Sequence, residues 1–165
     1  MNTLQAGYSK VNVNPMLGIP INGYFKPRYA EGILDDLEIV AVALACGETK
    51  TLLMAIDNLH IGTKLVKNYQ ERISEKTGIV KEAIFIHSTH THTAGTLDMY
   101  SKNELVLEYT EFVGKRFVDV AVFALEDLKP AKMGWAVGKA PNIAFVRRFR
   151  MKDGKVRTNP VVGNP

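Results

Sequence analysis

The amino-acid sequence predicts an α/β fold, a mixed β-sheet with helices packed on it. Two apolar, β-branched runs, residues 38–46 and 51–57, flank a short polar turn and predict an antiparallel hairpin. Apolar residues at helical spacing predict helices over 61–76 and 103–128, and a third apolar strand, 83–88, lies between them. The continuous apolar character of the two hairpin strands predicts that they are buried on both faces, and 83–88 is predicted to be a third buried strand.

The rest of the chain predicts shorter elements. Residues 4–13 alternate as in a strand, and the segment 14–32 is rich in Pro and Gly and predicts a loop. A loop of this length inside a domain is usually functional. Residues 132–139 and 142–151 predict two further strands, and Asp153-Gly154 predicts a tight turn after the second of them.

Length and composition limit the class of protein. The chain has 165 residues, 46% apolar and 23% charged, which predicts one globular domain with a buried core. The longest apolar run, Ile39 to Cys46, is 8 residues, far short of the roughly 18 that a membrane-spanning helix needs. The N-terminus lacks a secretory signal pattern, so we expect a cytoplasmic protein. Cys46 is the only cysteine, which excludes an intrachain disulfide and leaves His and carboxylates as metal ligands.

The charge is divided unevenly along the chain. Residues 1–128 carry a net charge of −4, whereas residues 129–165 carry +8. The basic segment lacks the aromatic pattern of a nucleic-acid contact, so we expect no nucleic-acid partner. A solvated strand face, or a surface that meets acidic protein outside this chain, accounts for the same charges.

A histidine cluster follows the predicted strand 83–88. Three of the four histidines, His87, His90 and His92, fall within six residues. In extended backbone, residues two apart point the same way, so His90 and His92 are expected within about 7 Å of each other on one side of the chain. Neutral imidazole suits zinc, and a catalytic zinc has three protein ligands and an open position. The alternative is histidines that only hydrogen-bond to backbone at a strand end.

Asp57 ends the second hairpin strand and has two interpretations. It orients His90 or His92, as carboxylates do for metal-bound imidazoles. Alternatively, it caps the helix that follows.

The order of motifs along the chain resembles that of a known family. The matching points are Ala6-Gly7, Asn14-Pro15, Asn22-Gly23-Tyr24, Gly32-Ile33 before Asp36-Leu37, Asp57, Thr89-His90-Thr91-His92 and Arg147. Across residues 1–165 the chain resembles the N-terminal part of the neutral/alkaline ceramidases, including their shorter bacterial relatives. The Thr-His-Thr-His element is the most specific of these motifs.

The resemblance implies roles for four residues. His90 matches a zinc ligand, and His92 matches a histidine that faces the substrate amide beside the metal. Arg147 matches an arginine that contacts the substrate near the zinc. Gly23 matches a glycine that lines the substrate pocket.

The chain departs from the family pattern at two places. Val146 and Arg148 replace the Asn and Ser that flank the arginine in ceramidases. The family's other zinc ligands, a second His, a Glu and a Tyr, correspond to positions beyond Pro165. We therefore expect residues 1–165 to be one partial ceramidase-like N-terminal domain of a truncated chain, with the remainder of the catalytic domain missing.

The function that the resemblance implies is zinc-dependent hydrolysis of an N-acyl amide bond. In ceramidases this reaction converts N-acylsphingosine to fatty acid and sphingosine, a step of sphingolipid metabolism. We expect a lipid or small amide as substrate and an inactive fragment. The alternatives are a non-catalytic domain and a metal-dependent hydrolase of another amide or ester.

Overall fold

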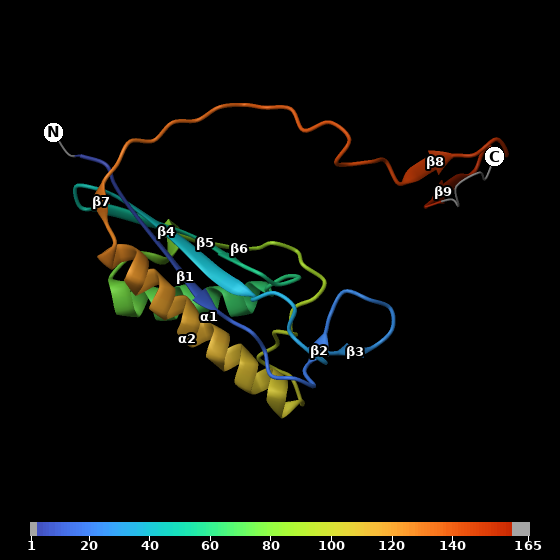
Figure 1. Ribbon diagram of the computed structural model, residues 1–165, viewed down its shortest axis with the longest axis horizontal. Helices are drawn as coiled ribbons and strands as arrows, with labels where there is room; N and C mark the ends of the chain where they lie inside the picture. The colour runs from blue at the N-terminus through green and yellow to red at the C-terminus, as the bar shows by residue number, and fades with distance from the viewer. Residues whose placement is uncertain (1–2, 160–165) are drawn as a thin grey trace. The chain divides into compact units, whose positions relative to one another are not determined.

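The computed structural model describes residues 3–159, and the chain divides into two units, Met1–Lys132 and Met133–Pro165. The first unit contains a sheet with two long helices (Figure 1). Its elements are β1 (Gln5–Asn12), β2 (Pro20–Ile21), β3 (Arg28–Tyr29), β4 (Glu38–Cys46), β5 (Thr49–Ile56), α1 (Thr63–Thr77), the 3₁₀ turn η1 (Lys81–Ala83), β6 (Ile84–Ser88), α2 (Glu104–Glu126) and β7 (Lys129–Pro130). Of the described helices, none is long and apolar enough to cross a membrane.

The main sheet has five strands in the order β6-β5-β4-β1-β7. β4 and β5 form the predicted antiparallel hairpin, β1 pairs antiparallel with β4 and with β7, and β5 pairs parallel with β6. Because antiparallel and parallel pairs occur together, the predicted mixed sheet is confirmed. The parallel pair is connected through α1, as a parallel pair requires.

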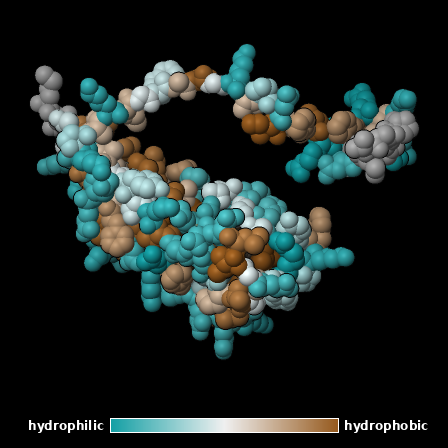
Figure 2. Space-filling model, viewed as in Figure 1, coloured by the Kyte–Doolittle hydropathy of each residue, from teal (hydrophilic) through white to brown (hydrophobic). Residues whose placement is uncertain are grey.

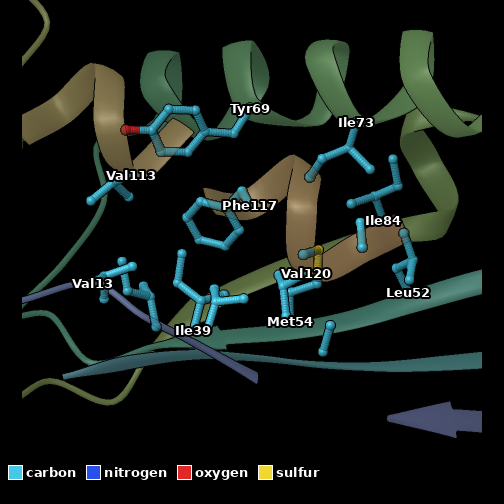
Figure 3. Close-up of a cluster of buried hydrophobic side chains, with 14 of the residues drawn as sticks. Val13, Ile39, Leu52, Met54, Tyr69, Ile73, Ile84, Val113, Phe117 and Val120 are labelled. Carbon is cyan, nitrogen blue, oxygen red and sulfur yellow. The ribbon is translucent and has the colours of Figure 1, made fainter. Parts of the chain in front are cut away.

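Both helices pack on one face of this sheet. The hydrophobic core lies between the helices and that face (Figure 3). The helical spacing predicted the buried face of α1, where Leu65, Tyr69 and Ile73 are buried. It likewise predicted that of α2, where Val113 and Phe117 are among the buried residues. Gly78, in left-handed conformation, caps the C-terminus of α1. Asn103 caps the N-terminus of α2, and its side chain accepts a hydrogen bond from the backbone N–H of Leu105.

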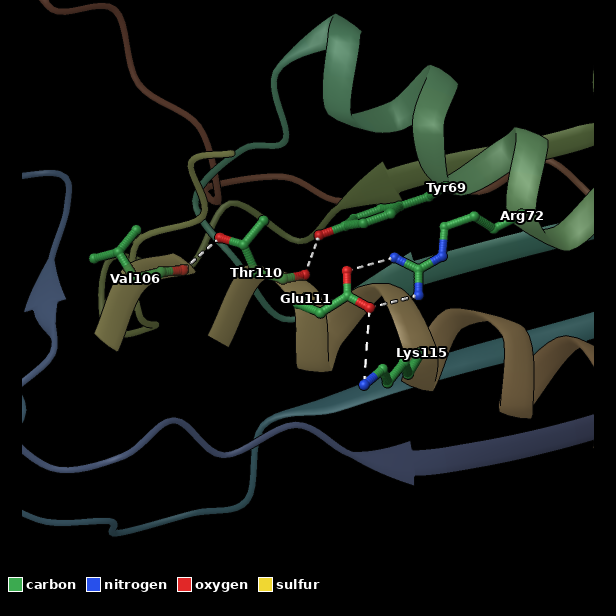
Figure 4. Close-up of polar contacts among 6 residues, drawn as sticks. All are labelled: Tyr69, Arg72, Val106, Thr110, Glu111 and Lys115. Atoms are coloured by element: carbon green, nitrogen blue, oxygen red, sulfur yellow. Dashed lines mark hydrogen bonds and ion pairs between the residues drawn. The ribbon is translucent and has the colours of Figure 1, made fainter. Parts of the chain in front are cut away.

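Buried hydroxyl groups join the helices to their surroundings. The hydroxyl of Tyr69 donates to the carbonyl oxygen of Thr110 at 2.8 Å, and beside it Arg72 of α1 forms an ion pair with Glu111 of α2 (Figure 4). The hydroxyl of Tyr109 donates to the carbonyl oxygen of Val13 at 2.7 Å. Burial raises the pKa of both phenols. Both therefore stay protonated donors.

The expectation that the apolar strands are buried on both faces is wrong. Along β4, buried residues alternate with partly exposed ones, and in β6 only Ile84 is buried. The other face carries apolar side chains that are exposed, among them Leu53 and Phe85. The reason is that α1 and α2 both lie on the same side, so they cover one face of the sheet.

The loop predicted over residues 14–32 contains two short strands. β2 and β3 pair antiparallel, with Pro20 opposite Tyr29 and Ile21 opposite Arg28. Backbone contacts attach this small hairpin to the segment after β6, since Ile21 forms a bridge with Gly95. The predicted loop is thereby held against the histidine segment.

The second unit is described as far as Asn159. It contains β8 (Arg148–Arg150) and β9 (Val156–Thr158), an antiparallel hairpin whose turn includes the predicted Asp153-Gly154. The strand predicted over 132–139 is absent, and of 142–151 only β8 is a strand. A strand needs a hydrogen-bonding neighbour, and among the described residues no strand pairs with 132–139 or with the part of 142–151 that precedes β8. Both hydrophobic and hydrophilic residues are exposed along the second unit (Figure 2).

Candidate functional site

The parallel pairing of β5 and β6 places the ends of both strands at one edge of the sheet. Ile56 lies opposite Ser88 in the register, so Asp57 and Thr89 leave the sheet side by side. The backbone N–H of Thr89 donates to the carbonyl oxygen of Ile56 at 3.0 Å, and the Thr89 hydroxyl donates to Asp57 at 3.1 Å. The histidine segment therefore begins from a fixed position.

His90 adopts a left-handed backbone conformation, with φ of 67°. Such a conformation is uncommon for a residue with a side chain and is concentrated at functional sites. Two carbonyl oxygens after β5 hold the residue there: that of Asn58 accepts from the His90 backbone N–H at 3.0 Å, and that of Leu59 contacts the imidazole Nδ1 at 2.8 Å. The backbone turn and the ring orientation are thus both set by residues 58–59.

His92 is oriented from a different part of the chain, the loop between β2 and β3. Its imidazole Nδ1 lies 2.8 Å from the carbonyl oxygen of Gly23. The ring of Tyr24 meets the imidazole edge to face, with 5.7 Å between ring centroids. The Gly-Tyr pair singled out in the sequence is therefore in direct contact with His92.

The two imidazoles lie together, with 5.1 Å between ring centroids and an angle of 86° between ring planes. The predicted proximity is confirmed, but the reason given for it is wrong. The segment is not extended there, because the left-handed turn at His90 interrupts the strand geometry. Side-chain alternation does not place the rings together; the backbone turn and the carbonyl oxygens of Leu59 and Gly23 do.

The same two carbonyl oxygens determine which ring nitrogens remain available. A carbonyl oxygen only accepts hydrogen bonds, so Nδ1 of His90 and Nδ1 of His92 each carry a proton when the ring is neutral. The lone pair of each neutral ring is then on Nε2. Metal-binding histidines commonly have this arrangement, in which the other ring nitrogen donates to a backbone carbonyl or a carboxylate.

The donor set fits part of a zinc site. Two neutral imidazole nitrogens suit zinc, which takes three or four protein ligands. Within residues 3–159, no group of three or more His, Cys, Asp or Glu side chains is placed to hold one metal ion. His90 and His92 therefore provide at most two of the ligands that such a site requires.

Asp57 does not hydrogen-bond to either imidazole. One carboxylate oxygen accepts from the Thr89 hydroxyl, and the other accepts from the backbone N–H of Glu38 at 3.1 Å. The carboxylate contacts Thr89, the residue before His90, and its role in orienting the histidines stays a prediction. Arg147 belongs to the second unit, where it is exposed and its carbonyl oxygen accepts from the backbone N–H of Asn159 at 2.8 Å. Its predicted contact with substrate also stays a prediction.

Sequence reasoning missed two residues of the site. Asn58 is buried, and its side-chain amide donates to the carbonyl oxygen of Gly95 at 2.9 Å, which spans the base of the histidine segment. Arg28 donates from Nη2 to the carbonyl oxygen of His92 at 2.6 Å. A polar residue directly after a buried strand was the available signal for Asn58. The sequence carried no signal for Arg28, whose partner lies 64 positions away.

A pocket of about 520 Å³ lies against the histidine segment, at Thr91 and Thr93. Thr91 and Thr93, on either side of His92, form part of its wall, and their hydroxyl oxygens lie 2.8 Å apart. Most of the remaining wall is apolar, and it includes Pro15, Ile21, Ala30, Ile33, Leu34 and Leu37. The sequence did not identify this pocket, because its walls come from the loop before β4 and from the segment after β6.

Comparison with solved structures finds the same fold in neutral ceramidases. The neutral ceramidase from Pseudomonas aeruginosa matches with a TM-score of 0.66 at 16% sequence identity, over 79% of this chain and 22% of that chain. The fold resembles part of a neutral ceramidase. A ceramidase solved in complex with C2 matches with a TM-score of 0.62 at 17% identity, again over 79% of this chain and 22% of that one.

The resemblance to ceramidases that the motifs predicted is thus confirmed for the fold. The chain spans about a fifth of the length of the ceramidases it matches. No model of a protein family matches the sequence, and no curated protein matches it. The ceramidase-like fold places the Thr-His-Thr-His element at the carboxyl end of β6.

Proposed function

We propose that this chain forms part of a zinc-dependent, ceramidase-like hydrolase that cleaves an N-acyl amide bond. The observation that carries the proposal is the pair of imidazoles 5.1 Å apart, each with Nδ1 bonded to a backbone carbonyl oxygen. This arrangement prepares two Nε2 atoms for a cation or a substrate oxygen. The ceramidase-like fold supports the choice of reaction.

His90 and His92 have different roles in the proposed site. His90 Nε2 would hold the zinc, and His92 would contact the substrate amide next to it. Bound zinc supplies a water molecule of lowered pKa and polarises a carbonyl group. Nδ1 of His92 stays on the Gly23 carbonyl oxygen, so its Nε2 is directed by the protein backbone and not by the substrate.

Arg147 is proposed to stabilise the negative charge that develops on the amide oxygen. A guanidinium ion suits this role because it keeps its charge and donates several hydrogen bonds in a fixed plane. This role is proposed because Arg147 matches the family's arginine in the order of motifs. Arg147 lies in the basic second unit.

The apolar pocket supports a substrate with a hydrocarbon part. Its wall reaches Thr91 and Thr93, so a ligand there lies next to the histidine segment. Burial of hydrocarbon contributes about 0.8 kcal/mol for each methylene group removed from water. An aliphatic amide would thereby be held with its polar group near His92.

Zinc titration of the 165-residue chain, followed by calorimetry, tests the proposal. We expect weak binding, because His90, with at most His92 beside it, supplies fewer than the three or four ligands of a stable zinc site. His90→Ala should abolish it, and His92→Ala should weaken it or leave it unchanged. His87→Ala is the matched control, since His87 lies on β6 beside Phe85 and outside the pair.

Two outcomes would contradict parts of the proposal. If His90→Ala binds zinc as the unmodified chain does, the histidine pair is no metal site, and a non-catalytic domain becomes the better interpretation. We expect no appreciable hydrolysis of an N-acyl amide by the chain alone. Robust hydrolysis that a chelator abolishes would show that two histidines and the rest of this chain suffice.

A further inference from the structure

Arg28 contacts His92 directly, although the two residues are 64 positions apart in the sequence. It begins β3, where it pairs with Ile21 of β2. From there its Nη2 donates to the carbonyl oxygen of His92 at 2.6 Å. A hydrogen bond from a charged donor is among the stronger ones in proteins. The backbone of His92 is therefore tied to the β2–β3 hairpin.

Arg28 also contacts the residue that packs against the imidazole. Its guanidinium carbon lies 3.8 Å from the centroid of the Tyr24 ring, and the Tyr24 ring meets His92 edge to face. Stacking of a guanidinium on an aromatic ring is favourable by about 0.5–2 kcal/mol, depending on exposure. One side chain thus holds His92 at its carbonyl oxygen and, through Tyr24, at its ring.

The surroundings of Arg28 favour a positioning role over a surface charge. Of the ion pairs between described residues, none includes Arg28, and its buried Nε has no hydrogen-bond partner there. A buried donor without a partner lowers stability. The contacts with Tyr24 and His92 therefore keep the guanidinium in a place that is otherwise unfavourable for it.

We propose that Arg28 is a positioning residue that sets the ring orientation and the tautomer of His92. It holds residues 23–24 against the imidazole, so that the Gly23 carbonyl oxygen keeps the proton on Nδ1 and leaves the lone pair on Nε2. The use of that lone pair in hydrolysis rests on the proposed function. The orientation itself does not.

Nitrogen-15 NMR of the imidazole side chains in the 165-residue chain tests this inference. At a pH where the rings are neutral, we expect the Nδ1–H tautomer at both His90 and His92. Arg28→Ala should convert His92 to a mixture of tautomers and leave His90 unchanged, because the Leu59 carbonyl oxygen holds that ring. Tyr24→Leu should change His92 in the same direction.

Two controls separate positioning from loss of structure. Arg116→Ala removes another guanidinium that donates to a backbone carbonyl oxygen, that of Asn12, and should leave both histidines unchanged. Arg28→Lys keeps a donor but not the planar stack, and should restore His92 only in part. An unchanged His92 tautomer in Arg28→Ala would overturn the inference, and so would equal loss of both histidine signatures.

The outcome is distinguishable from failure of the proposed function. If His92 depends on Arg28 but zinc does not bind, the positioning role stands and the hydrolase proposal fails. If zinc binding requires His90 but the His92 tautomer is indifferent to Arg28, the hydrolase proposal stands and this inference fails.

Discussion

Gly23 and His92 occupy adjoining space with no room for another atom between them. A Cβ atom added to Gly23 would lie 2.8 Å from Cγ of the His92 imidazole. Gly23 also has φ of 102°, a conformation that side-chain-bearing residues rarely adopt. The hydrogen bond between its carbonyl oxygen and the imidazole joins positions that are 69 residues apart.

Gly23→Ala should therefore both lower stability and displace His92. We expect a loss of about 1–3 kcal/mol in the free energy of unfolding, from backbone strain at positive φ and from the steric clash. Urea unfolding measures the stability, and imidazole NMR measures the displacement of His92.

Gly32→Ala is the matched control for Gly23. Its added Cβ would meet no atom within 4 Å, and its φ lies outside the left-handed region. We expect a change within about 0.5 kcal/mol, as at most surface sites. Equal losses at Gly23 and Gly32 would show that the contact with His92 is not the cause.

Gly7 allows close approach between β1 and the end of α2. An added Cβ would lie within 2.9 Å of backbone atoms of Asp127 and Leu128. Backbone cannot move aside as a flexible side chain can, so Gly7→Ala should cost about 1–3 kcal/mol or more. Thermal unfolding measures this loss, and an unchanged midpoint would show that the helix end moves freely.

The buried hydroxyls of Tyr69 and Tyr109 should each contribute measurably to stability. Tyr69→Phe removes the hydroxyl donor to the Thr110 carbonyl oxygen, and Tyr109→Phe removes the hydroxyl donor to that of Val13. We expect each variant to lose about 1–2 kcal/mol in the free energy of unfolding.

Tyr29→Phe is the control for the loss of a phenol hydroxyl, because Tyr29 is exposed. It should leave the urea midpoint unchanged. If the two buried tyrosines behave as Tyr29 does, the hydrogen bonds are not stabilising.

Asp127 should make stability depend on pH in the acid range. The hydrogen bond from the Tyr8 backbone N–H, helped by Lys129, holds the pKa of this carboxyl below its usual value of 3.8. A group with a lowered folded-state pKa stabilises the fold above its usual pKa, and this contribution disappears as the pH falls through the folded-state value.

The test compares urea midpoints of the unmodified chain and of Asp127→Asn as the pH falls below the usual carboxyl range. The stability advantage of the unmodified chain over the variant should shrink with falling pH. Glu126→Gln is the control for removing one neighbouring negative charge and should give no such convergence. Parallel curves for Asp127→Asn and the unmodified chain would contradict the prediction.

The sequence predicted those parts of the fold that local patterns determine. Leu65, Tyr69 and Ile73 recur at helical spacing, so α1 and its buried face could be predicted. Which face of the sheet is covered and which is open could not be predicted. Local patterns do not determine that both helices pack on the same side of the sheet, because this depends on the packing of the whole first unit. The same limit explains the strand wrongly predicted over 132–139, because a local sequence pattern gives no information about a pairing neighbour.

In the candidate site, too, some features could be predicted from the local sequence and others depend on tertiary contacts. The clustering of His90 and His92 was visible in the sequence, and their proximity is confirmed. The groups that hold their rings were not visible as such, since Leu59 and Gly23 act through backbone carbonyl oxygens that any residue type provides. Arg28 acts through a contact made only after β2 and β3 fold against the histidine segment.

The face of the sheet opposite the helices is the basis of the last prediction. Tyr8, Val42, Leu53 and Phe85 are neighbours in the strand register and form a row across β1, β4, β5 and β6. The side chains of Tyr8, Leu53 and Phe85 are 53%, 45% and 59% exposed. A contiguous apolar surface of this kind commonly marks an interaction site or promotes association.

We expect the 165-residue chain to bind an apolar dye and to self-associate in sedimentation velocity experiments. Leu53→Thr with Phe85→Thr should reduce both effects while keeping strand-compatible residues at each position. Leu17→Thr removes a leucine that is more exposed than Leu53 and lies outside the main sheet, and it should change neither. A stable monomer that binds no dye would show that this face is well solvated in spite of its apolar row, and the double variant would then differ little from the unmodified chain.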